Sequence, residues 1–497
     1  MLFNSYQFLL FYPVVLIIFM MIPRRWFKWK RIWLFLCSLF FYSCWNPRHL
    51  ILLVTCIATT YCCGLLLDRT EGQKMRRLIV AFGLIINFGL LFFFKYSGFF
   101  VATVNSILSR FGLGPYAEGF DVTLPVGISF YTFQSVGYII DVFRKEIPAE
   151  KDPVKYGLFV SFFPQLVAGP IERSKNILSQ IDVVCKEHRF DPDMIKSGFI
   201  YMFWGFFLKM VIADRISILV DNVFDRYYAY GTIILIIAVI SFSLQIYCDF
   251  ASYSCIAVGS ARILGFTLME NFETPYFSRT VREFWRRWHI SLSTWFRDYL
   301  YIPLGGSRCS KLRKYINIMI TFMVSGLWHG ADWTFVFWGG LHGLYQVAGD
   351  ITLPFRKKIA GFFMVKTESF GHRFAQMIVT FALTSFAWLF FRADSITDAL
   401  AIVSRMFSHF DPWTLTDKSI YTLGLDVSQM HILWFSLLIL IAVSILRYHK
   451  GIRIDSFICS QGSLFQAFAV YALLMIIMIF GKYGASDEMN AFIYFRF

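Results

Sequence analysis

Apolar runs separated by short polar stretches recur along almost the whole chain. A helix of about 20 apolar residues crosses a bilayer, so this pattern predicts helices that span or enter a membrane. We expect an all-α polytopic membrane protein with about 11 to 13 membrane segments. The clearest of these segments cover residues 8–22, 33–45, 49–67, 78–94, 96–108, 195–212, 233–247, 374–391, 432–446 and 465–480.

Two further apolar stretches are interrupted by small, polar and proline residues. They are LPVGISFYTFQSVGYIIDVFR at 124–144 and SFFPQLVAGPIERS at 161–174. Such interruptions favour helix packing, or a broken helix that lines a cavity, over a lipid-facing span. The polar stretch 176–192 predicts a surface loop. We find no internal repeat and expect residues 1–497 to form a single integral membrane domain.

Composition and charge support a membrane protein and argue against a nucleic-acid partner. Only 16% of the residues are charged, compared with about 25% in soluble domains. The net charge is +15, but Lys and Arg lie in short loops between apolar runs, as the positive-inside rule predicts. The ten cysteines show no paired CxxC pattern, so we expect neither a metal site nor a disulfide framework.

The longest polar interruption covers residues 261–314, and its part rich in arginine and tryptophan covers residues 271–314. In that part, NFETPYFSRTVREFWRRWHISLSTWFRDYLYIPLGGSR at 271–308 alternates arginines with aromatic residues. The stretch is too polar to span a membrane and too aromatic to be a free linker. It predicts an interfacial or partly re-entrant helical layer at the cytoplasmic face. A purely structural layer over anionic lipid is an equal alternative to a direct role in substrate binding.

Two histidines interrupt the apolar stretch SGLWHGADWTFVFWGGLHG at 325–343. If a helix enters the membrane near Tyr315, His329 lies roughly 21 Å further on, deep in a hydrocarbon layer about 30 Å thick. An ionisable side chain at that depth normally serves function, although a core histidine bonded to a backbone carbonyl is the alternative. His342 lies roughly 220° around a straight helix from His329, so a shared cavity requires a break at an intervening glycine. Residues 315–350 are therefore the predicted catalytic region.

Several common enzyme motifs are missing from the chain. We find no Walker phosphate loop, no GxSxG elbow and no HExxH zinc motif. A secondary transporter is a natural competitor, because broken helices and buried polar groups also mark transport pathways. The absence of a clear two-halves symmetry in the hydropathy pattern weakens that alternative.

Three long stretches resemble the membrane-bound O-acyltransferases, specifically the bacterial branch that contains the alginate O-acetyltransferase membrane subunit. They are QIYCDFASYSCIAVGSARILGF at 245–266, the arginine-rich stretch at 271–308 and the histidine stretch at 325–343. The segments MLFNSYQFLLFYP, LPVGISFYTFQ, PQLVAGPIER and FRADS fit the same branch. The protein that transfers D-alanine to teichoic acid shares part of this pattern.

The resemblance implies a fold and a reaction. The fold is a helical ring with re-entrant and interfacial helices around a central funnel. The reaction moves an acetyl group from acetyl-CoA, a substrate at the cytoplasmic face, toward a polysaccharide outside the membrane, with no bound cofactor. The resemblance also implies a multi-pass protein of the bacterial inner membrane, in contact with lipid. An extracytoplasmic partner with an SGNH-type, serine-hydrolase-like fold completes the transfer in the family.

The resemblance also implies roles for the residues of this chain that match the family's motifs. His329 matches the family's characteristic histidine and would act as base or transient acyl relay, a role suited to a buried neutral imidazole. His342 is the second catalytic candidate. The candidates for substrate binding are Trp328, His289, Asp249 and the three arginines Arg286, Arg287 and Arg297, whose guanidinium groups suit the phosphates of the donor.

Two positions depart from the patterns of the family. His289 stands forty positions before His329, where many members of the wider family carry Asn or Asp, so a simple Asn/His dyad is in doubt. Cys255 stands where the bacterial branch usually has Asp, and we leave it out of the catalytic set. Asp249 keeps its place. It either pairs with a cation such as Arg262 or Arg297, which we favour, or lines a wet cavity.

Other functions stay open on the sequence alone. Within acyl transfer, the alternatives are D-alanyl transfer to teichoic acid and O-acetylation of peptidoglycan. In a different class, the chain would be a transporter or a scaffold of an exopolysaccharide assembly, and its histidines would be structural.

Overall fold

The computed structural model describes residues 1–114, 123–187, 191–483 and 492–493. These residues form helices, turns and connecting segments, with no strand among them, which confirms the all-α prediction. Two compact units can be distinguished, one of residues 1–202 and 256–269 and the other of residues 203–255 and 270–497. The boundary falls within two helices, and each unit is described separately below.

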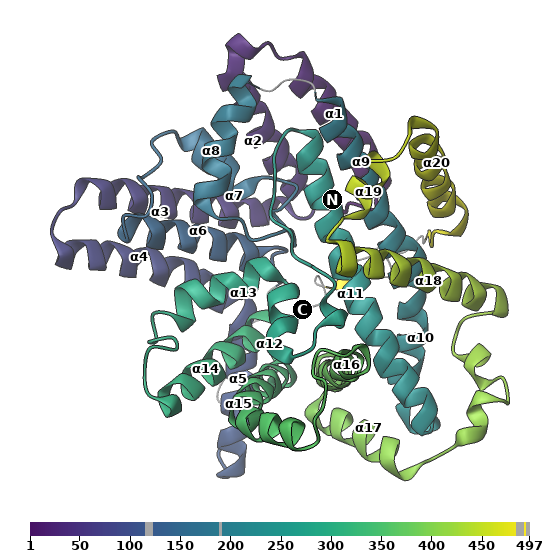
Figure 1. Ribbon diagram of the computed structural model, residues 1–497. Coiled ribbons are helices and arrows are strands. Elements are labelled where there is room, and N and C mark those ends of the chain that lie inside the picture. Colours follow the sequence, from purple (N-terminus) through teal and green to yellow (C-terminus); the bar gives the residue numbers. More distant parts are fainter. Residues whose placement is uncertain (115–122, 188–190, 484–491, 494–497) are drawn as a thin grey trace. The chain divides into compact units, whose positions relative to one another are not determined.

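The first unit contains the N-terminal helices (Figure 1). Their bounds are α1 Tyr6–Met21, η1 Arg24–Trp26, α2 Phe27–Ser43, η2 Pro47–His49, α3 Leu50–Arg69, α4 Gln73–Leu91, η3 Phe92–Tyr96, α5 Ser97–Arg110, α6 Ile128–Phe143, α7 Pro153–Ser161, α8 Ser174–Glu187 and most of α9 Pro192–Phe206. Helices α3, α4 and α6 pack against one another, and almost every residue of α6 is buried. That burial explains why small and polar residues interrupt its sequence.

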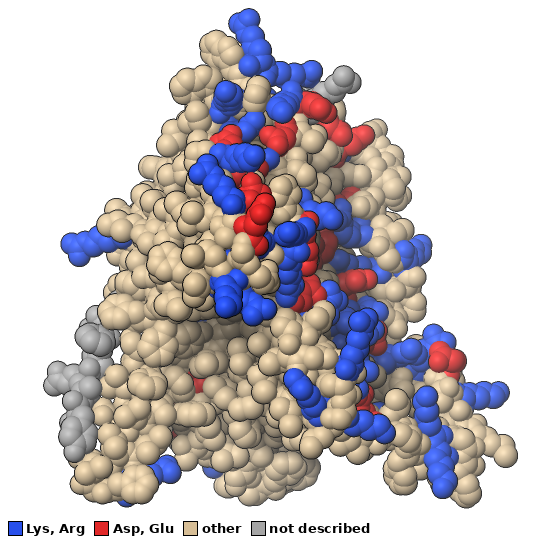
Figure 2. Space-filling model, turned by 90° about the vertical axis from the view of Figure 1, so that its left-hand side faces the viewer, with Lys and Arg blue, Asp and Glu red and all other residues tan. Residues whose placement is uncertain are grey.

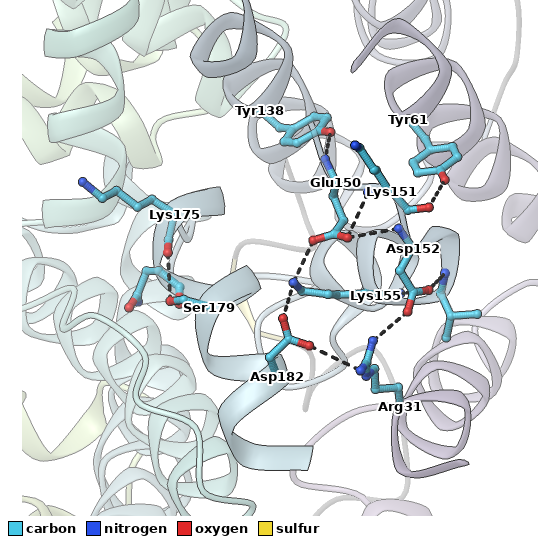
Figure 3. Close-up of polar contacts among 12 residues, drawn as sticks. Arg31, Tyr61, Tyr138, Glu150, Lys151, Asp152, Lys155, Lys175, Ser179 and Asp182 are labelled. Carbon is cyan, nitrogen blue, oxygen red and sulfur yellow. Dashed lines mark hydrogen bonds and ion pairs between the residues drawn. The ribbon is translucent and has the colours of Figure 1, made fainter. Parts of the chain in front are cut away.

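A network of ion pairs joins α2, α7 and α8 in the first unit (Figure 3). Arg31 of α2 lies 2.6 Å from Asp152, which caps α7, and 3.3 Å from Asp182 of α8. Lys155 of α7 lies 2.6 Å from the same Asp182 and 2.7 Å from Glu150. Because Arg31 and Lys155 are largely buried, the network fixes how these three helices pack.

The polar stretch 176–192 is helical over most of its length, so the loop prediction is wrong there. It forms the larger part of α8, and residues 188–190 lie outside the described part. The buried residues Ile177, Leu178, Ile181, Val184 and Cys185 recur at helical spacing along one face. Their wide separation by polar residues hides the helix from a search for continuous apolar runs.

The second unit contains the remaining helices (Figure 1). Their bounds are η4 Phe207–Ala213, α10 Asp214–Phe224, η5 Tyr227–Ala229, most of α11 Thr232–Ile263, η6 Pro275–Phe277, α12 Val281–Arg287, α13 Ile290–Phe296, η7 Arg297–Tyr301, α14 Lys311–His329, α15 Trp333–Phe362, α16 Phe370–Arg392, α17 Ile396–Ser408, η8 Pro412–Leu415, η9 Ser419–Thr422, α18 Val427–Lys450, α19 Ile454–Cys459 and α20 Ser463–Phe480. The arginine-rich stretch forms the short helices α12 and α13, each too short to span a membrane.

Helices α14 and α15 form a tight hairpin, side by side in Figure 1. Two glycines allow this approach. A Cβ atom on Gly326 would collide with the carbonyl oxygen of Phe335, and one on Gly339 would collide with that of Phe322. The two backbones are therefore in direct contact, as at other membrane helix pairs built on small residues.

Among the residues that the structure describes, six helical stretches are long and apolar enough to cross a membrane: Pro47–Arg69, Gln73–Arg110, Thr232–Ile263, Phe370–Arg392, Val427–Lys450 and Ser463–Phe480. A bent pair, Tyr6–Met21 with Arg24–Ser43, brings the total to seven if it counts as one span. The segments predicted at 78–94 and 96–108 belong to one continuous helical stretch. Others of the expected 11 to 13 segments form helices that are short, as α6 is, or interrupted, as α9 and η4 are.

The surface matches a protein that lies in lipid. On the face shown in Figure 2, charged side chains gather in part of the surface, and broad areas carry almost none. Large apolar side chains are exposed on the candidate spans, for example Ile51, Ile85 and Phe435. Such surface is costly in water and favourable in hydrocarbon.

Candidate active site

His329 is the last residue of α14, next to the turn that leads into α15. Gly330 follows in an extended conformation and ends the helix. Asp332 then caps α15, because its carboxylate accepts a hydrogen bond from the backbone N–H of Thr334 at 2.7 Å. The sequence Trp-His-Gly-Ala-Asp thus encodes a helix end, a short turn and a helix start, and the turn fixes the position of the histidine.

Aromatic side chains surround His329. Its ring centroid lies 5.0 Å from that of Trp328, 5.1 Å from Trp338 and 5.7 Å from Phe391. Only 3% of His329 is exposed. Burial among aromatic rings disfavours a charged imidazolium, so the surroundings suit a neutral base.

A second imidazole lies beside His329. His289 precedes α13 with a left-handed backbone (φ 43°), and its ring centroid lies 6.5 Å from that of His329. The ring centroid of Trp328 lies 6.0 Å from that of His289 and 5.0 Å from that of His329. The ring centroid of Phe250 lies 4.5 Å from that of His289. Burial lowers the pKa of His289 to about 3, so this imidazole is neutral at physiological pH.

Asn271 holds the turn that carries His289. Its backbone carbonyl accepts a hydrogen bond from the N–H of Ile290 (3.0 Å), and its side-chain oxygen accepts one from Ser291 (3.2 Å). The side-chain amide donates to Ser254 Oγ at 3.1 Å. Asn271 therefore satisfies the free N–H groups at the start of α13 from a distant segment of the chain.

His342 lies on the far side of Trp338 from His329. Its ring centroid is 5.0 Å from that of Trp338, and its Nδ1 accepts a hydrogen bond from Trp285 Nε1 at 3.2 Å. The structure thus brings His329, His289 and Trp328 together, and separates His342 from them by one indole ring. The assignment of His342 to catalysis stays a prediction.

The three candidate arginines have different surroundings. Arg287 pairs with Glu283 at 3.0 Å and lies over the ring of Tyr448, and Arg297 pairs with Asp298 at 2.8 Å. Arg286 is exposed and has no ion-pair partner among the described residues. Of the three, Arg286 is the exposed guanidinium that has no carboxylate partner among the described residues, which leaves it available to an anionic ligand.

Asp249 takes part in a buried charge cluster that sequence reasoning missed. Its carboxylate lies 2.6 Å from Lys209 Nζ, and Lys209 is 2.9 Å from Asp214. The second oxygen of Asp249 accepts a hydrogen bond from the backbone N–H of Ile493 at 2.7 Å. The expected pairing of Asp249 is confirmed, but the cation is Lys209, and the prediction of Arg262 or Arg297 is wrong. Lys209, a lysine deep within the apolar segment 195–212, was the available signal.

Comparisons with known proteins show the family of the chain. The family model of MBOAT, the membrane-bound O-acyltransferase family, matches residues 25–391, which include both His289 and His329. The chain belongs to the membrane-bound O-acyltransferase family. As a member, it is an O-acyltransferase and a multi-pass bacterial membrane protein.

Three relatives show where the chain falls within the family. It is 35% identical to a probable alginate O-acetylase AlgI of Azotobacter vinelandii over 91% of this chain and 85% of the relative. It is also 35% identical to a peptidoglycan O-acetyltransferase of Helicobacter pylori, over 76% and 73% of the two chains. A teichoic acid D-alanyltransferase of Bacillus subtilis is 29% identical over 47% of this chain. The likeness to O-acetylating relatives is thus more extensive than the likeness to the D-alanyltransferase.

Proposed function

We propose that the chain moves an acetyl group from acetyl-CoA at the cytoplasmic face toward an exported or cell-surface polysaccharide, for O-acetylation of that polymer. The observation that carries this proposal is the buried pair of imidazoles, His329 and His289, at the end of α14. The coverage of the alginate O-acetylase relatives supports an acetyl group and an alginate-like polymer. O-acetylation of peptidoglycan is the second candidate. The peptidoglycan O-acetyltransferase of Helicobacter pylori is also 35% identical to this chain, but over 76% of its length instead of the 91% matched by the alginate O-acetylase.

His329 is the base in this proposal. The neutral imidazole removes the proton of the acceptor hydroxyl as its oxygen attacks the thioester carbon, which contributes about 10²- to 10⁴-fold to the rate. The C–O bond forms, the C–S bond breaks, and the departing thiolate of CoA receives the proton from His329. His289 lies close enough to orient His329 or to share its proton through one intervening group.

The donor is bound from the cytoplasm in this proposal. Arg286 contacts a phosphate of acetyl-CoA, because it is exposed and has no ion-pair partner among the described residues. Arg287 holds α12 in place through Glu283 and Tyr448. A secreted or membrane-anchored partner of SGNH type completes transfer to the polymer outside the membrane.

The test uses the full chain in lipid nanodiscs, with acetyl-CoA as donor and alginate oligosaccharides or peptidoglycan fragments as acceptors. Release of CoA and acetylation of the oligosaccharide, detected by mass spectrometry, are measured for wild type and His329→Ala. His449→Ala is the matched control, because His449 is an exposed histidine outside the site. A thermal melt verifies that each variant is folded.

We expect His329→Ala to lose at least about 10²-fold in turnover while it stays folded, and His449→Ala to match wild type. Normal turnover by His329→Ala would reject the assignment of the base. Transfer of D-alanine from a carrier protein, with no use of acetyl-CoA, would reject acetyl transfer.

A further inference from the structure

Three buried tryptophans near the histidines contact one another through their rings. The ring centroid of Trp388 lies 5.2 Å from that of Trp338 and 5.0 Å from that of Trp288. The indole of Trp388 shares a hydrogen bond with Tyr276, whereas Nε1 of Trp338 and of Trp288 has no hydrogen-bond partner among the described residues. Buried donors without partners are rare in folded proteins, and a functional role is a frequent reason for them.

Trp338 differs from the other two in its neighbours. It is fully buried, and its ring lies 5.1 Å from that of His329 and 5.0 Å from that of His342. The ring planes of Trp338 and His329 meet at 86°, so the two rings pack edge to face. Trp338 reaches this place because the contact of Gly339 with the Phe322 backbone draws α15 close to α14.

The proposed reaction creates a need for such a donor. When the hydroxyl oxygen attacks the thioester carbon, the C=O electron pair moves to the carbonyl oxygen, which becomes a buried oxyanion. A fixed donor in a dry, low-dielectric site stabilises that charge far better than water does. Collapse of the intermediate restores the C=O bond and expels the thiolate of CoA.

We propose that the indole N–H of Trp338 is this donor and that Trp338 is a catalytic residue of the acyl transfer. The inference rests on the proposed function, since His329 and Trp338 act on the same intermediate from adjacent positions. It also explains why the N–H group of Trp338 has no partner among the residues that the structure describes. The indole N–H group of Trp338 would donate its hydrogen bond to the acyl carbonyl oxygen when the substrate is bound.

The test separates the N–H group from the ring. Trp338→Phe keeps an aromatic ring and removes the donor, and 3-benzothienylalanine at position 338 keeps the shape of the indole with sulfur in place of N–H. Both are compared with wild type in nanodiscs for kcat, for KM toward acetyl-CoA and for the thermal melt. Trp388→Phe is the matched control, because Trp388 is as buried as Trp338 and stacks on its ring.

We expect both replacements at Trp338 to lower kcat about 10²- to 10³-fold, the loss typical of one oxyanion donor. KM for acetyl-CoA should change less than about 2-fold, and Trp388→Phe should keep kcat within about 3-fold of wild type. A benzothienyl variant with normal kcat overturns the proposal, and so does an equal loss in Trp388→Phe. If His329→Ala is inactive while the benzothienyl variant turns over normally, the Trp338 role fails and the proposed function stands. If His329→Ala turns over normally, the proposed function fails on its own.

Discussion

The ring centroids of His289 and His329 lie 6.5 Å apart, although the two residues are forty positions apart in the chain. His342, which is nearer in sequence, is separated from His329 by Trp338. Both imidazoles contact the ring of Trp328. His289 is therefore a stronger candidate than His342 for a role beside His329.

His289→Ala should lower kcat more than His342→Gln does. His289 lies beside the proposed base, so we expect its loss to cost about 10²-fold or more in turnover. His342 accepts a hydrogen bond from Trp285, and a glutamine can still accept it, so we expect a loss below about 10-fold. Steady-state kinetics of both variants in nanodiscs provide the measurement. Equal losses would assign His342 to the reaction.

Asn271→Ala should act through His289. Loss of the side-chain acceptor frees the N–H group of Ser291 and lets the strained turn at His289 relax, so we expect kcat to fall by about 10-fold. Asn271→Asp keeps the acceptor oxygen and should recover most of the activity. Asn87→Ala, a buried asparagine of the first unit, is the control for stability alone. A double variant with His289→Ala should show no further loss from Asn271→Ala, whereas additive losses would contradict this route.

Arg286→Ala should weaken donor binding without affecting the fold. An exposed guanidinium that binds a phosphate contributes about 1.5 to 3 kcal/mol, so KM for acetyl-CoA should rise about 10-fold or more. Arg287→Ala should instead lower the melting temperature, because Arg287 contacts Glu283 and Tyr448. Acetyl-dephospho-CoA identifies the phosphate, since Arg286→Ala should no longer distinguish the two donors if Arg286 binds the 3′-phosphate. An unchanged KM would move the donor site elsewhere.

Lys209→Met should destabilise the second unit strongly. The substitution leaves the buried carboxylates of Asp214 and Asp249 without their cation, and breaking a buried pair in this way costs about 3 to 5 kcal/mol. Lys196→Met, at a partly exposed lysine, should have little effect. Thermal melts in nanodiscs compare the two. If Lys209→Met had the same melting temperature as wild type, the charge cluster would not stabilise the fold.

Glu172 should make stability depend on pH. Burial raises the pKa of its carboxyl from 4.5 to about 7, although the N–H groups of Asn176 and Met269 oppose the shift. The folded chain therefore keeps a proton that the unfolded chain releases between pH 4.5 and about 7, so stability falls as pH rises through this window. Glu172→Gln should remove this slope. Melting temperatures of both proteins at pH 5, 6, 7 and 8 test it, and parallel curves would contradict the assignment.

The sequence predicted those features that a local pattern determines. Continuous apolar runs predicted the long helices that can cross a membrane, although six or seven such spans are found among the described residues and 11 to 13 segments were expected. The position of His329 in an apolar stretch marked it as a candidate for function. The partner of Asp249 was not predictable, because Lys209 meets it only when η4 packs beside α11. The ring of Trp338 reaches His329 only through the crossing of α14 and α15 at two glycines, and the motif alone does not give that crossing angle. Helix α8 was missed because its apolar residues are spaced along one face of the helix.

The glycine contact between α14 and α15 has a consequence for how the enzyme responds to its membrane. Backbone meets backbone at Gly326 and Gly339, with no flexible side chain between the helices. Such packing resists sliding of one helix along the other. We therefore expect the spacing between His329 and Trp338, and with it the rate of the chemical step, to depend little on the thickness of the bilayer.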